Sequence, residues 1–220
     1  MSIGAIIQAR LGSTRLPNKV LMDIEGKPML QRVIDRVRES EYIDSIAIAV
    51  PSSDQELAQL AMGSGIGFFA HDGDENDVLD RYYRAASFYK ADPIVRITAD
   101  CPLIDPQVID KVIERYLTGH FDYVSNMDFY PDGLDTEVFS SDALRIAWVK
   151  AETPRDREHV TSYMYSNPEL LRIGSIRYKR KLPYYHWSVN VQKDLDFVRW
   201  VYQKLGDRFY LEDILELVSG

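Results

Sequence analysis

Cysteine is almost absent from this chain. Cys101 is the single cysteine among 220 residues, so no disulfide can form within the chain. Nothing therefore indicates an oxidising compartment, and we expect the protein in the cytoplasm. No apolar run reaches the roughly 18 residues that a membrane-spanning helix requires. The N-terminus also lacks the basic and apolar regions of a signal peptide, so we expect no membrane partner.

Positive charge is also in short supply. The chain has 26 Lys and Arg against 34 Asp and Glu, which gives a formal net charge of −8. Because nucleic-acid backbones demand clustered cations, we expect no nucleic-acid partner. The four histidines are scattered, and neither zinc-site spacings such as HExxH nor a GxSxG element occurs. These absences argue against zinc and serine-hydrolase chemistry.

The first half of the chain alternates short apolar runs with amphipathic segments. Four runs are typical of buried strands: residues 4–9, 45–50, 67–70 and 93–98. Between them, Ser53 and Glu56 predict a capping box. Further helix starts are predicted at Asn76 or Asp77 and at Asp105. This alternation predicts an α/β fold with a doubly wound, mostly parallel sheet that binds ligands at the carboxyl ends of its strands.

The alternation loosens after Gly119. Strand candidates follow at residues 122–125, 135–140, 171–178 and 184–191, and two closing helices are predicted at residues 193–205 and 211–219. No linker, repeat or low-complexity segment divides the chain, so we expect one domain over residues 1–220. We interpret residues 127–185 as a part inserted late in that domain.

The most informative segment is IGAIIQARLGSTRLPNKVL, near the N-terminus. Arg10, Arg15 and Lys19 bracket a turn at Gly12 and Ser13, where small residues let backbone N–H groups approach a ligand. The first 22 residues contain no Asp or Glu, so the loop is a cationic island that suits a triphosphate. It matches neither the Walker A pattern nor GxGxxG. Charge alone leaves open an ordinary strand-to-helix loop with solvated cations.

Residues 9–19 carry the string A-R-x-G-S-x-R-L-P-x-K. It resembles the nucleotide-binding segment of the cytidylyltransferases that activate acidic sugars, the CMP-sialic acid and CMP-KDO synthetases. The resemblance is closest to the spore coat polysaccharide biosynthesis protein F group. It implies CTP, Mg²⁺, a homodimer, and a late segment that carries dimer contacts and covers the sugar. It makes Arg10, Arg15 and Lys19 catalytic cations. The implied nucleotide contacts are Ala9, Arg10, Leu11, Gly12, Ser13 and Lys19.

Asp100 follows the predicted strand 93–98, in the segment RITADCPLIDP. It should therefore lie at the carboxyl edge of the sheet, beside the first loop, where a carboxylate near a triphosphate is a usual Mg²⁺ ligand. Spacing alone favours an ordinary turn aspartate before Pro102. The similar T-x-D-C-P-L-I-D segment of the family, whose Asp binds the metal, implies a catalytic metal ligand. Cys101 is expected to be a small loop residue.

Asp77 and Arg81 lie one helical turn apart in DENDVLDRYYRAA. They could contact the ribose or base of a nucleotide, or form an i,i+4 ion pair on a helix surface. The resembled family has a similar N/E-D-V-x-x-R-Y pattern here, which implies nucleotide contacts for both residues.

The segments PDGLDTEVF and RDREHVTSY resemble segments of the spore coat group. Asp135 and Glu137 alternate in a predicted strand and should face the same side. Carboxylates suit sugar hydroxyls, and Arg or His suits the carboxylate of an acidic sugar. We therefore predict substrate binding by Asp135, Glu137, Arg157 and His159. The alternative is a solvated strand face and a charged helix start.

One position departs from the resembled family. Those enzymes commonly carry V-D-x-x-x-D-L before the last helices, and its first Asp is the second metal ligand. Here the segment reads WSVNVQKDLDFV, with Asn190 at that position. An amide offers a neutral oxygen without charge, so the metal ligands are predicted to be Asp100 and Asn190. Alternatively, Asn190 only ends a strand before the next helix.

Together these features predict a nucleotidyltransferase that converts CTP and an acidic, nonulosonic acid-like sugar into a CMP-sugar and pyrophosphate. The product would serve surface polysaccharide or glycan assembly. Two alternatives remain open. A glycosyltransferase that uses a nucleotide sugar would need an Asp-x-Asp motif after a central strand, and that spacing occurs only at residues 72–74 and 194–196. A non-catalytic nucleotide-binding subunit is favoured by Asn190 alone.

Overall fold

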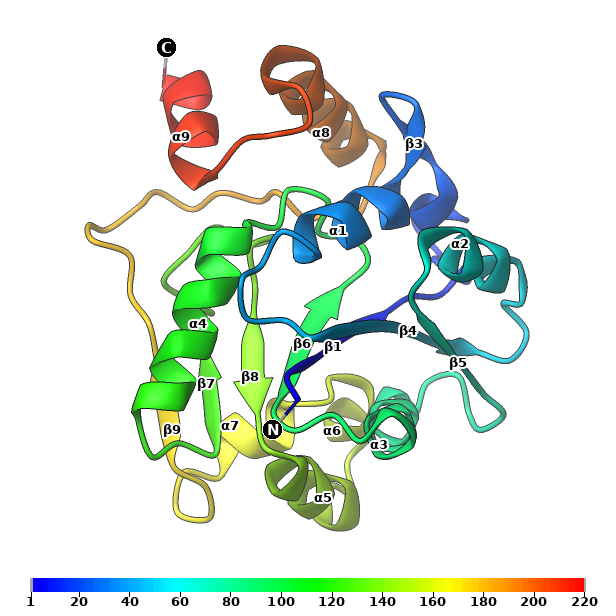
Figure 1. The fold of residues 1–220 in the computed structure, drawn as a ribbon, viewed down its shortest axis with the longest axis vertical. Helices are drawn as coiled ribbons and strands as arrows, with labels where there is room; N and C mark the ends of the chain where they lie inside the picture. Colours follow the sequence, from blue (N-terminus) through cyan, green and yellow to red (C-terminus); the bar gives the residue numbers. More distant parts are fainter. Residues whose placement is uncertain (1, 220) are drawn as a thin grey trace.

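The structure, a computed structural model, describes residues 2–219 and contains a seven-stranded sheet with helices on both faces (Figure 1). The strand order is β5-β4-β1-β6-β8-β7-β9. The strands are β1 (Gly4–Gln8), β4 (Ser45–Pro51), β5 (Gly67–His71), β6 (Ile94–Thr98), β7 (Tyr123–Ser125), β8 (Glu137–Phe139) and β9 (Ile173–Ser175). Only β8 runs antiparallel to its neighbours in this sheet. The predicted α/β class with a doubly wound, mostly parallel sheet is confirmed.

Helices cover the sheet according to the alternation of side chains along its strands. Ala5 and Ile7 on β1 pack with α1 (Met29–Val37), α2 (Glu56–Ser64) and α4 (Pro106–Thr118) on one face. Ile6 points to the other face, against α3 (Val78–Tyr89) and α5 (Ser141–Lys150). The remaining elements are η1 (Lys19–Leu21), β2 (Asp23–Ile24), β3 (Lys27–Pro28), α6 (Pro154–Glu158), α7 (Ser162–Ser166), α8 (Gln192–Leu205) and α9 (Leu211–Ser219).

The two C-terminal helices form a third apolar cluster with the start of α1 and with Trp187. Two buried arginines of α1 anchor the chain between α8 and α9. Arg32 Nη1 donates to Asp207 Oδ1 at 2.7 Å, and Arg36 Nη2 donates to the Phe209 carbonyl at 2.9 Å. These contacts fix the connection between α8 and α9 against α1.

Two predicted helix starts are confirmed. Asp77 caps α3 by accepting the Asp80 N–H at 2.9 Å. Asp105 caps α4, where its Oδ1 accepts the N–H groups of Gln107 and Val108. Both carboxylates satisfy helix N–H groups that would otherwise lack an intrahelical partner.

The predicted capping box of Ser53 and Glu56 is wrong. Helix α2 begins at Glu56 behind Gln55, and no side chain caps it. Instead, Asp54 is buried and accepts the Leu11 N–H at 2.7 Å. The polar residues before α2 therefore support the first loop rather than their own helix.

The predicted strand at residues 184–191 is also wrong. This segment forms only an isolated bridge between Asp132 and His186. Its N–H groups are satisfied by two different loops, because Trp187 donates to the Asp132 carbonyl and Val189 donates to the Asp100 carbonyl, each at 2.8 Å. The segment thus links the Asp132 loop to the end of β6.

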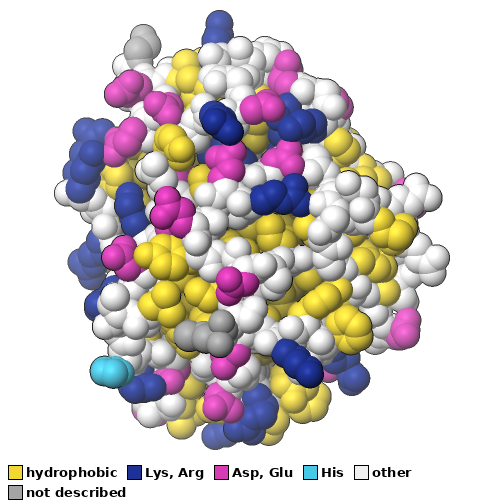
Figure 2. All heavy atoms as spheres, in the orientation of Figure 1, with side chains coloured by type: hydrophobic (Ala, Val, Ile, Leu, Met, Phe, Trp, Pro, Cys, Tyr) yellow, Lys and Arg dark blue, Asp and Glu magenta, His cyan; other side chains and the backbone are white. Residues whose placement is uncertain are grey.

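Figure 2 shows basic and acidic side chains interspersed toward the rim of one face, with apolar side chains nearer its centre. Charge on this face is therefore mixed rather than segregated. Between residues 2 and 219, no helix has the length and apolar character needed to cross a membrane.

Candidate active site

A cleft of about 320 Å³ lies at the carboxyl ends of β1 and β6, two neighbouring parallel strands. The strand order reverses here, because the chain passes from β1 to β4 and β5 on one side and then crosses to β6 on the other side of β1. Open α/β sheets bind ligands at such a point. The lining residues are Gln8, Ala9, Arg10, Ser13, Thr14, Arg15, Lys19, Val20, Val78, Arg81, Arg96, Thr98, Ala99, Asp100, Glu158, His159 and Asn190.

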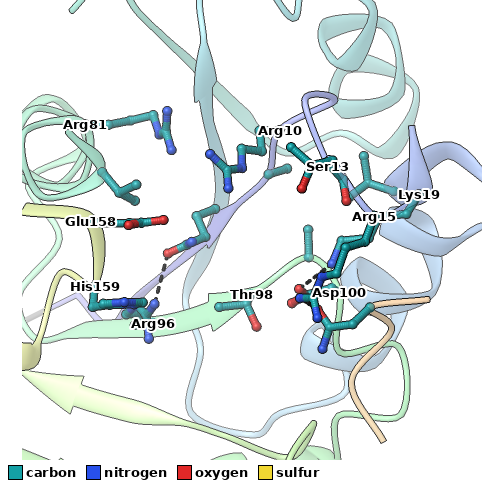
Figure 3. A pocket seen from close by; sticks show the side chains of 17 residues that line it. Arg10, Ser13, Arg15, Lys19, Arg81, Arg96, Thr98, Asp100, Glu158 and His159 are labelled. Carbon is teal, nitrogen blue, oxygen red and sulfur yellow. Dashed lines mark hydrogen bonds and ion pairs between the residues drawn. The ribbon is translucent and has the colours of Figure 1, made fainter. Parts of the chain in front are cut away.

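The cleft brings together most of the predicted site residues. Figure 3 shows the loop side chains Arg10, Ser13, Arg15 and Lys19 along one side, with Asp100 facing them. The predicted residues that line it are Ala9, Arg10, Ser13, Arg15, Lys19, Arg81, Asp100, His159 and Asn190, whereas Leu11, Gly12, Asp77, Asp135, Glu137 and Arg157 do not.

The loop after β1 is held by contacts within itself and with neighbouring turns. The Ser13 and Asn18 N–H groups donate to the Leu11 carbonyl at 2.8 and 3.2 Å, which folds the loop back on itself. A Cβ atom at Gly12 would lie 2.8 Å from Glu75 Oε1. That atom is the end of an exposed, flexible side chain, and Gly12 has no positive φ, so the fold of the loop alone does not require glycine at this position.

Lys19 joins the loop to the opposite wall of the cleft. Its Nζ donates to Asp100 Oδ2 and to the Val189 carbonyl, both at 2.7 Å. Burial would raise the pKa of Asp100, but the charge and hydrogen bond of Lys19 outweigh burial and lower that pKa. Asp100 is therefore an ionised carboxylate within the cleft at neutral pH.

Arg15 and Asn190 form a second contact across the cleft. Arg15 Nη2 donates to Asn190 Oδ1 at 2.8 Å, and Asn190 Nδ2 lies 3.3 Å from both His186 Nε2 and Ser188 Oγ. The Asn190 N–H donates to Asp194 Oδ2 at the start of α8. Asn190 thus lines the cleft and leads into α8, but it does not end a strand, because residues 184–191 form none.

These oxygens fit a magnesium ion that is shared with a nucleotide. Among residues 2–219, no group of three or more His, Cys, Asp or Glu side chains is arranged to hold a metal alone. Mg²⁺ is commonly bound by one or two carboxylates together with substrate phosphates and water. Asp100 and Asn190 supply oxygen donors of this kind, and the backbone bond from Val189 to Asp100 keeps them close.

Arg81 lies at the other end of the cleft, on the first turns of α3. It is 1% exposed, and its Nη1 donates to the Glu75 carbonyl at 3.3 Å. Its buried Nε has no partner within the described part of the chain, and burial lowers the pKa of its guanidinium. The predicted ion pair with Asp77 is not formed, which leaves Arg81 available to the cleft.

Asp77 and Arg157, both predicted to contact ligands, are instead paired with each other. Arg157 Nη2 donates to Asp77 Oδ2 at 2.5 Å, and its Nη1 donates to the Trp148 carbonyl at 2.9 Å. The pair ties α6 to the start of α3 outside the cleft lining. Neither side chain is free to bind substrate in this arrangement.

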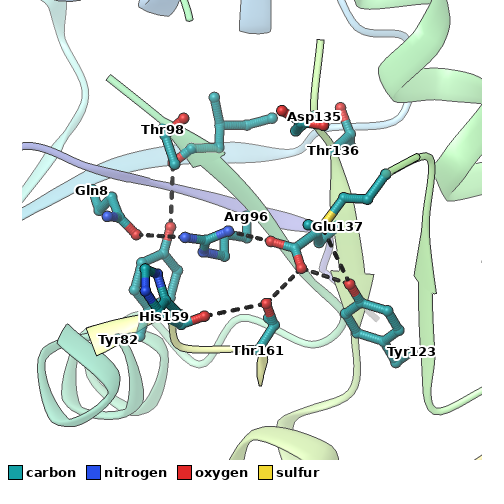
Figure 4. Close-up of polar contacts among 12 residues, drawn as sticks. Gln8, Tyr82, Arg96, Thr98, Tyr123, Asp135, Thr136, Glu137, His159 and Thr161 are labelled. Atoms are coloured by element: carbon teal, nitrogen blue, oxygen red, sulfur yellow. Dashed lines mark hydrogen bonds and ion pairs between the residues drawn. The ribbon is translucent and has the colours of Figure 1, made fainter. Parts of the chain in front are cut away.

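Glu137 and Asp135 do not line the cleft either. Glu137 is 1% exposed and lies in a buried network with Arg96, Tyr123 and Thr161 (Figure 4). Asp135 lines a second cavity of about 810 Å³. Burial, followed by the neighbouring Asp132 charge, raises the pKa of Asp135 to about 7.

Sequence reasoning assigned no role to Gln8, Arg96, Thr98 and Glu158, which line the cleft. Gln8 and Thr98 are the last residues of β1 and β6 and lie side by side in the register. Polar residues at the carboxyl ends of two buried parallel strands are a signal that the sequence contained. Arg96 interrupts an apolar strand, which was a signal as well, but its partner Glu137 comes from a distant strand.

The Asp-x-Asp spacings that a glycosyltransferase would use are not part of this site. Asp194 accepts the Asn190 and Val191 N–H groups at the start of α8. Residues 72–74 follow β5 without regular secondary structure, and none of these four carboxylates lines the cleft.

A cationic glycine-containing loop that faces an ionised carboxylate across the ends of parallel strands defines an α/β nucleotidyltransferase site. The chain belongs to the cytidylyltransferase family, whose model matches residues 4–217.

Two relatives extend this assignment. An uncharacterised protein of Methanocaldococcus jannaschii is 43% identical over 79% of this chain and 71% of its own length. The spore coat polysaccharide biosynthesis protein SpsF of Bacillus subtilis is 32% identical over 92% of this chain and 87% of its own length. The predicted resemblance to the spore coat group is confirmed.

Solved structures share the fold of this chain. A cytidylyltransferase from Leptospira borgpetersenii superposes with a TM-score of 0.93 at 26% identity, covering 100% of this chain and 94% of that one. A CMP:2-keto-3-deoxy-manno-octonic acid synthetase complexed with CTP superposes with a TM-score of 0.73 at 18% identity, covering 93% of this chain and 99% of that one. The latter likeness supports the fold alone.

Proposed function

We propose that this enzyme transfers the cytidylyl group of CTP to a hydroxyl of an acidic, nonulosonic acid-like sugar and releases pyrophosphate. The CMP-sugar would enter surface polysaccharide or glycan assembly. The observation that carries the proposal is the pair Lys19 and Asp100, a cation and an ionised carboxylate that meet across the cleft. Phosphoryl transfer needs both, because the developing charge must be neutralised and the phosphates positioned.

The phosphates of CTP would lie along the loop after β1. Arg10, Arg15 and Lys19 would neutralise the β and γ phosphates through charge-assisted hydrogen bonds. To do so, Lys19 and Arg15 would exchange their present partners, Asp100 and Asn190, for phosphate oxygens. Arg81 and Val78 line the far end of the cleft, where the nucleoside would lie.

The transfer step is an in-line displacement. The acceptor hydroxyl oxygen would form a bond to the α-phosphorus while the bond from that phosphorus to the β-phosphate oxygen breaks. The hydroxyl proton leaves to solvent or a nearby base, and Arg15 and Lys19 stabilise the departing pyrophosphate. A Mg²⁺ ion held by Asp100 and Asn190 would polarise the phosphate when bound.

The acidic acceptor is supported by two observations. Proteins with a similar chain include SpsF, named for spore coat polysaccharide, and a similar fold occurs in the synthetase named for 2-keto-3-deoxy-manno-octonic acid. Within the cleft, His159 and Arg96 place cationic or hydrogen-bonding groups away from the loop. A carboxylate on the acceptor would match them.

A homodimer is also part of the proposal. The residues that line the 810 Å³ cavity, Asp135 among them, all lie within residues 127–185. We propose that this segment carries the dimer contact and helps to cover the acceptor. Light scattering at micromolar concentration should give twice the 25.4 kDa mass of the chain, and a single-chain mass would contradict it.

The test is a pyrophosphate-release assay with each nucleoside triphosphate against a panel of acidic and neutral sugars. We expect release with CTP and an acidic sugar only, and none in Asp100→Asn, which should fold normally because Asn has the same shape. Full activity of Asp100→Asn at limiting Mg²⁺ would show that Asp100 is not a metal ligand. Release with neutral sugars alone would overturn the acidic acceptor.

A further inference from the structure

The inner end of the cleft contains a buried ion pair that the transfer step does not use. Arg96 on β6 lies directly opposite Glu137 on β8 in the antiparallel register, and Arg96 Nη1 donates to Glu137 Oε2. The side chains are only 14% and 1% exposed. A buried pair of this kind needs further hydrogen bonds to offset the cost of removing two charges from water.

Both carboxylate oxygens of Glu137 already accept hydrogen bonds from neighbouring side chains. Its Oε2 accepts from Arg96, and its Oε1 accepts from the Tyr123 hydroxyl at 2.6 Å and the Thr161 hydroxyl at 2.5 Å (Figure 4). It does not line the cleft. We therefore infer that Glu137 holds Arg96 in position and does not itself contact substrate.

Arg96, in contrast, lines the cleft and has hydrogen-bond capacity left. Its Nη1 donates to Glu137 and its Nη2 donates to Gln8 Oε1 at 3.1 Å. A guanidinium carries five N–H groups, so three remain. Its buried Nε has no partner within the described residues. An unsatisfied group on a fixed guanidinium is costly unless a ligand or water completes the arrangement.

The hydrogen bonds around Glu137 also help to position His159 in the cleft. Thr161, which donates to Glu137, also donates its N–H to the His159 carbonyl at 2.5 Å. Between them, buried Val160 has a φ of 51°, a left-handed conformation that β-branched residues rarely adopt. Such strain persists only where surrounding contacts impose it, and it clusters at functional sites. Figures 3 and 4 both show His159 beside Arg96.

We propose that Arg96, held in place by Glu137 and flanked by His159, binds the carboxylate of the acceptor and thereby selects acidic over neutral sugars. A planar guanidinium matches a carboxylate through two parallel hydrogen bonds, and its fixed position reduces the entropy lost on binding. Arg157, assigned this role from sequence, is committed to Asp77 and the Trp148 carbonyl. The inference rests on the proposed transfer to an acidic sugar.

The test compares acids with their methyl esters. N-acetylneuraminate, 3-deoxy-manno-octulosonate and the methyl ester of each serve as acceptors with saturating CTP, and pyrophosphate release gives kcat/KM. We expect wild type to prefer acid over ester by about 10- to 100-fold, the range of a charge-assisted hydrogen bond. In Arg96→Gln this ratio should fall toward one, while the KM for CTP stays within about twofold of wild type. Arg96→Lys should keep part of the preference.

Glu137→Gln tests the positioning role. It should lower the acid-to-ester ratio as Arg96→Gln does, because the guanidinium loses its anchor, whereas a purely structural defect would slow both acceptors alike. Arg172→Gln is the matched control, because Arg172 also pairs with a carboxylate, Asp122 at 2.9 Å, but on the exposed surface. Its ratio should equal that of wild type.

Folding of every variant is checked by CTP binding without acceptor. Where a single variant does not fold, Arg96→Gln combined with Glu137→Gln removes both buried charges together and carries the test. An unchanged acid-to-ester ratio in a folded Arg96→Gln or double variant would overturn the inference and leave the proposed function standing. A wild-type enzyme that converts neutral sugars but no acid would overturn both.

Discussion

At the scale of single residues, Lys19 pairs with Asp100 and, in the proposed function, would also hold a phosphate of CTP. Its replacement by Ala should weaken CTP binding by roughly 1.5–3 kcal/mol, the value of a charge-assisted hydrogen bond. Because Lys19 lowers the pKa of Asp100, its loss should also raise that pKa. The acidic limb of the activity profile should move to higher pH. Calorimetric titration with CTP and a pH–rate profile measure the two effects.

Lys204→Ala is the control for Lys19→Ala, since Lys204 is an exposed lysine of α8. It should change neither CTP affinity nor the pH profile. Equal CTP affinity in Lys19→Ala and Lys204→Ala would remove Lys19 from the phosphate site.

Asn190→Asp should lower the Mg²⁺ concentration that gives half-maximal rate, because a carboxylate holds Mg²⁺ more tightly than an amide oxygen. Arg15, which now donates to Asn190 Oδ1, can donate equally to the new carboxylate, so the loop should keep its position. A magnesium titration of the rate, for wild type and variant, measures the shift. If the two curves coincide, Asn190 has no role in metal binding.

The sequence showed which residues gather in the cleft better than it showed their partners. Loop residues such as Lys19 were recognisable because small residues and cations followed a strand. The pairing of Asp77 with Arg157 could not be predicted, since the two lie 80 positions apart and partner choice depends on how α6 packs on α3. Arg96 went unnoticed for the same reason, because Glu137 reaches it only through the antiparallel pairing of β8.

At the scale of secondary structure, Asp105 holds two helix starts together. Its Oδ1 caps α4, and its Oδ2 accepts the Leu211 N–H at 2.5 Å where α9 begins. Asp105→Ala should lower the free energy of unfolding by roughly 2–4 kcal/mol, because a helix cap is lost and a buried N–H is left without a partner. Denaturant unfolding followed by circular dichroism measures this change.

Thr153 provides the matched comparison. It caps α6 by accepting the Asp156 N–H at 3.1 Å, but at an exposed helix start. Thr153→Ala should cost about 1 kcal/mol or less. If Asp105→Ala costs no more than Thr153→Ala, the link between α4 and α9 does not stabilise the fold.

The elements of the first half were predictable because local signals agree there. Apolar runs and helical periodicity pointed to β1, β4, β5, β6 and the helices between them, and caps correctly marked the starts of α3 and α4 but not that of α2. Residues 184–191 also have strand-like composition, yet they form no strand, because their N–H groups bond to the loops at Asp132 and Asp100. Composition measures how well a segment suits extended backbone, not whether a neighbouring strand is there to pair with it.

At the scale of the whole molecule, stability should depend on pH through Asp135. Its pKa rises from 3.8 to about 7 on folding, so the folded protein binds this proton more tightly than the unfolded chain. Stability from this group is therefore present in full below about pH 4 and is lost as pH rises toward 7. The slope is at most about 1.4 kcal/mol per pH unit. Denaturant unfolding between pH 5 and pH 8 measures this dependence.

Asp135→Asn should flatten this pH dependence and leave the protein more stable than wild type at pH 8, because no buried charge then forms. Asp142→Asn is the control, since the Asp142 side chain is 82% exposed. It should follow wild type across the same range. A wild-type stability that rises steadily from pH 5 to pH 8 would contradict the role of Asp135.

The order of strands was beyond sequence reasoning. Four strands follow the alternating pattern, but β8 enters between β6 and β7 although it comes after both in the chain. That placement depends on contacts between distant residues rather than on local pattern. It also brings Glu137 beside Arg96, which lines the cleft, because the two residues meet only in this order.

The contacts of Lys19 with Asp100 and of Arg15 with Asn190 would compete with the binding of the proposed phosphates and metal. A phosphate oxygen that pairs with Lys19 or Arg15 would free an oxygen of Asp100 or Asn190 for metal binding. Nucleotide and metal should therefore bind with positive cooperativity, and by thermodynamic reciprocity each raises the affinity for the other by the same factor. If the cleft binds Mg²⁺ and CTP as proposed, it should bind the metal–nucleotide complex more readily than the bare metal.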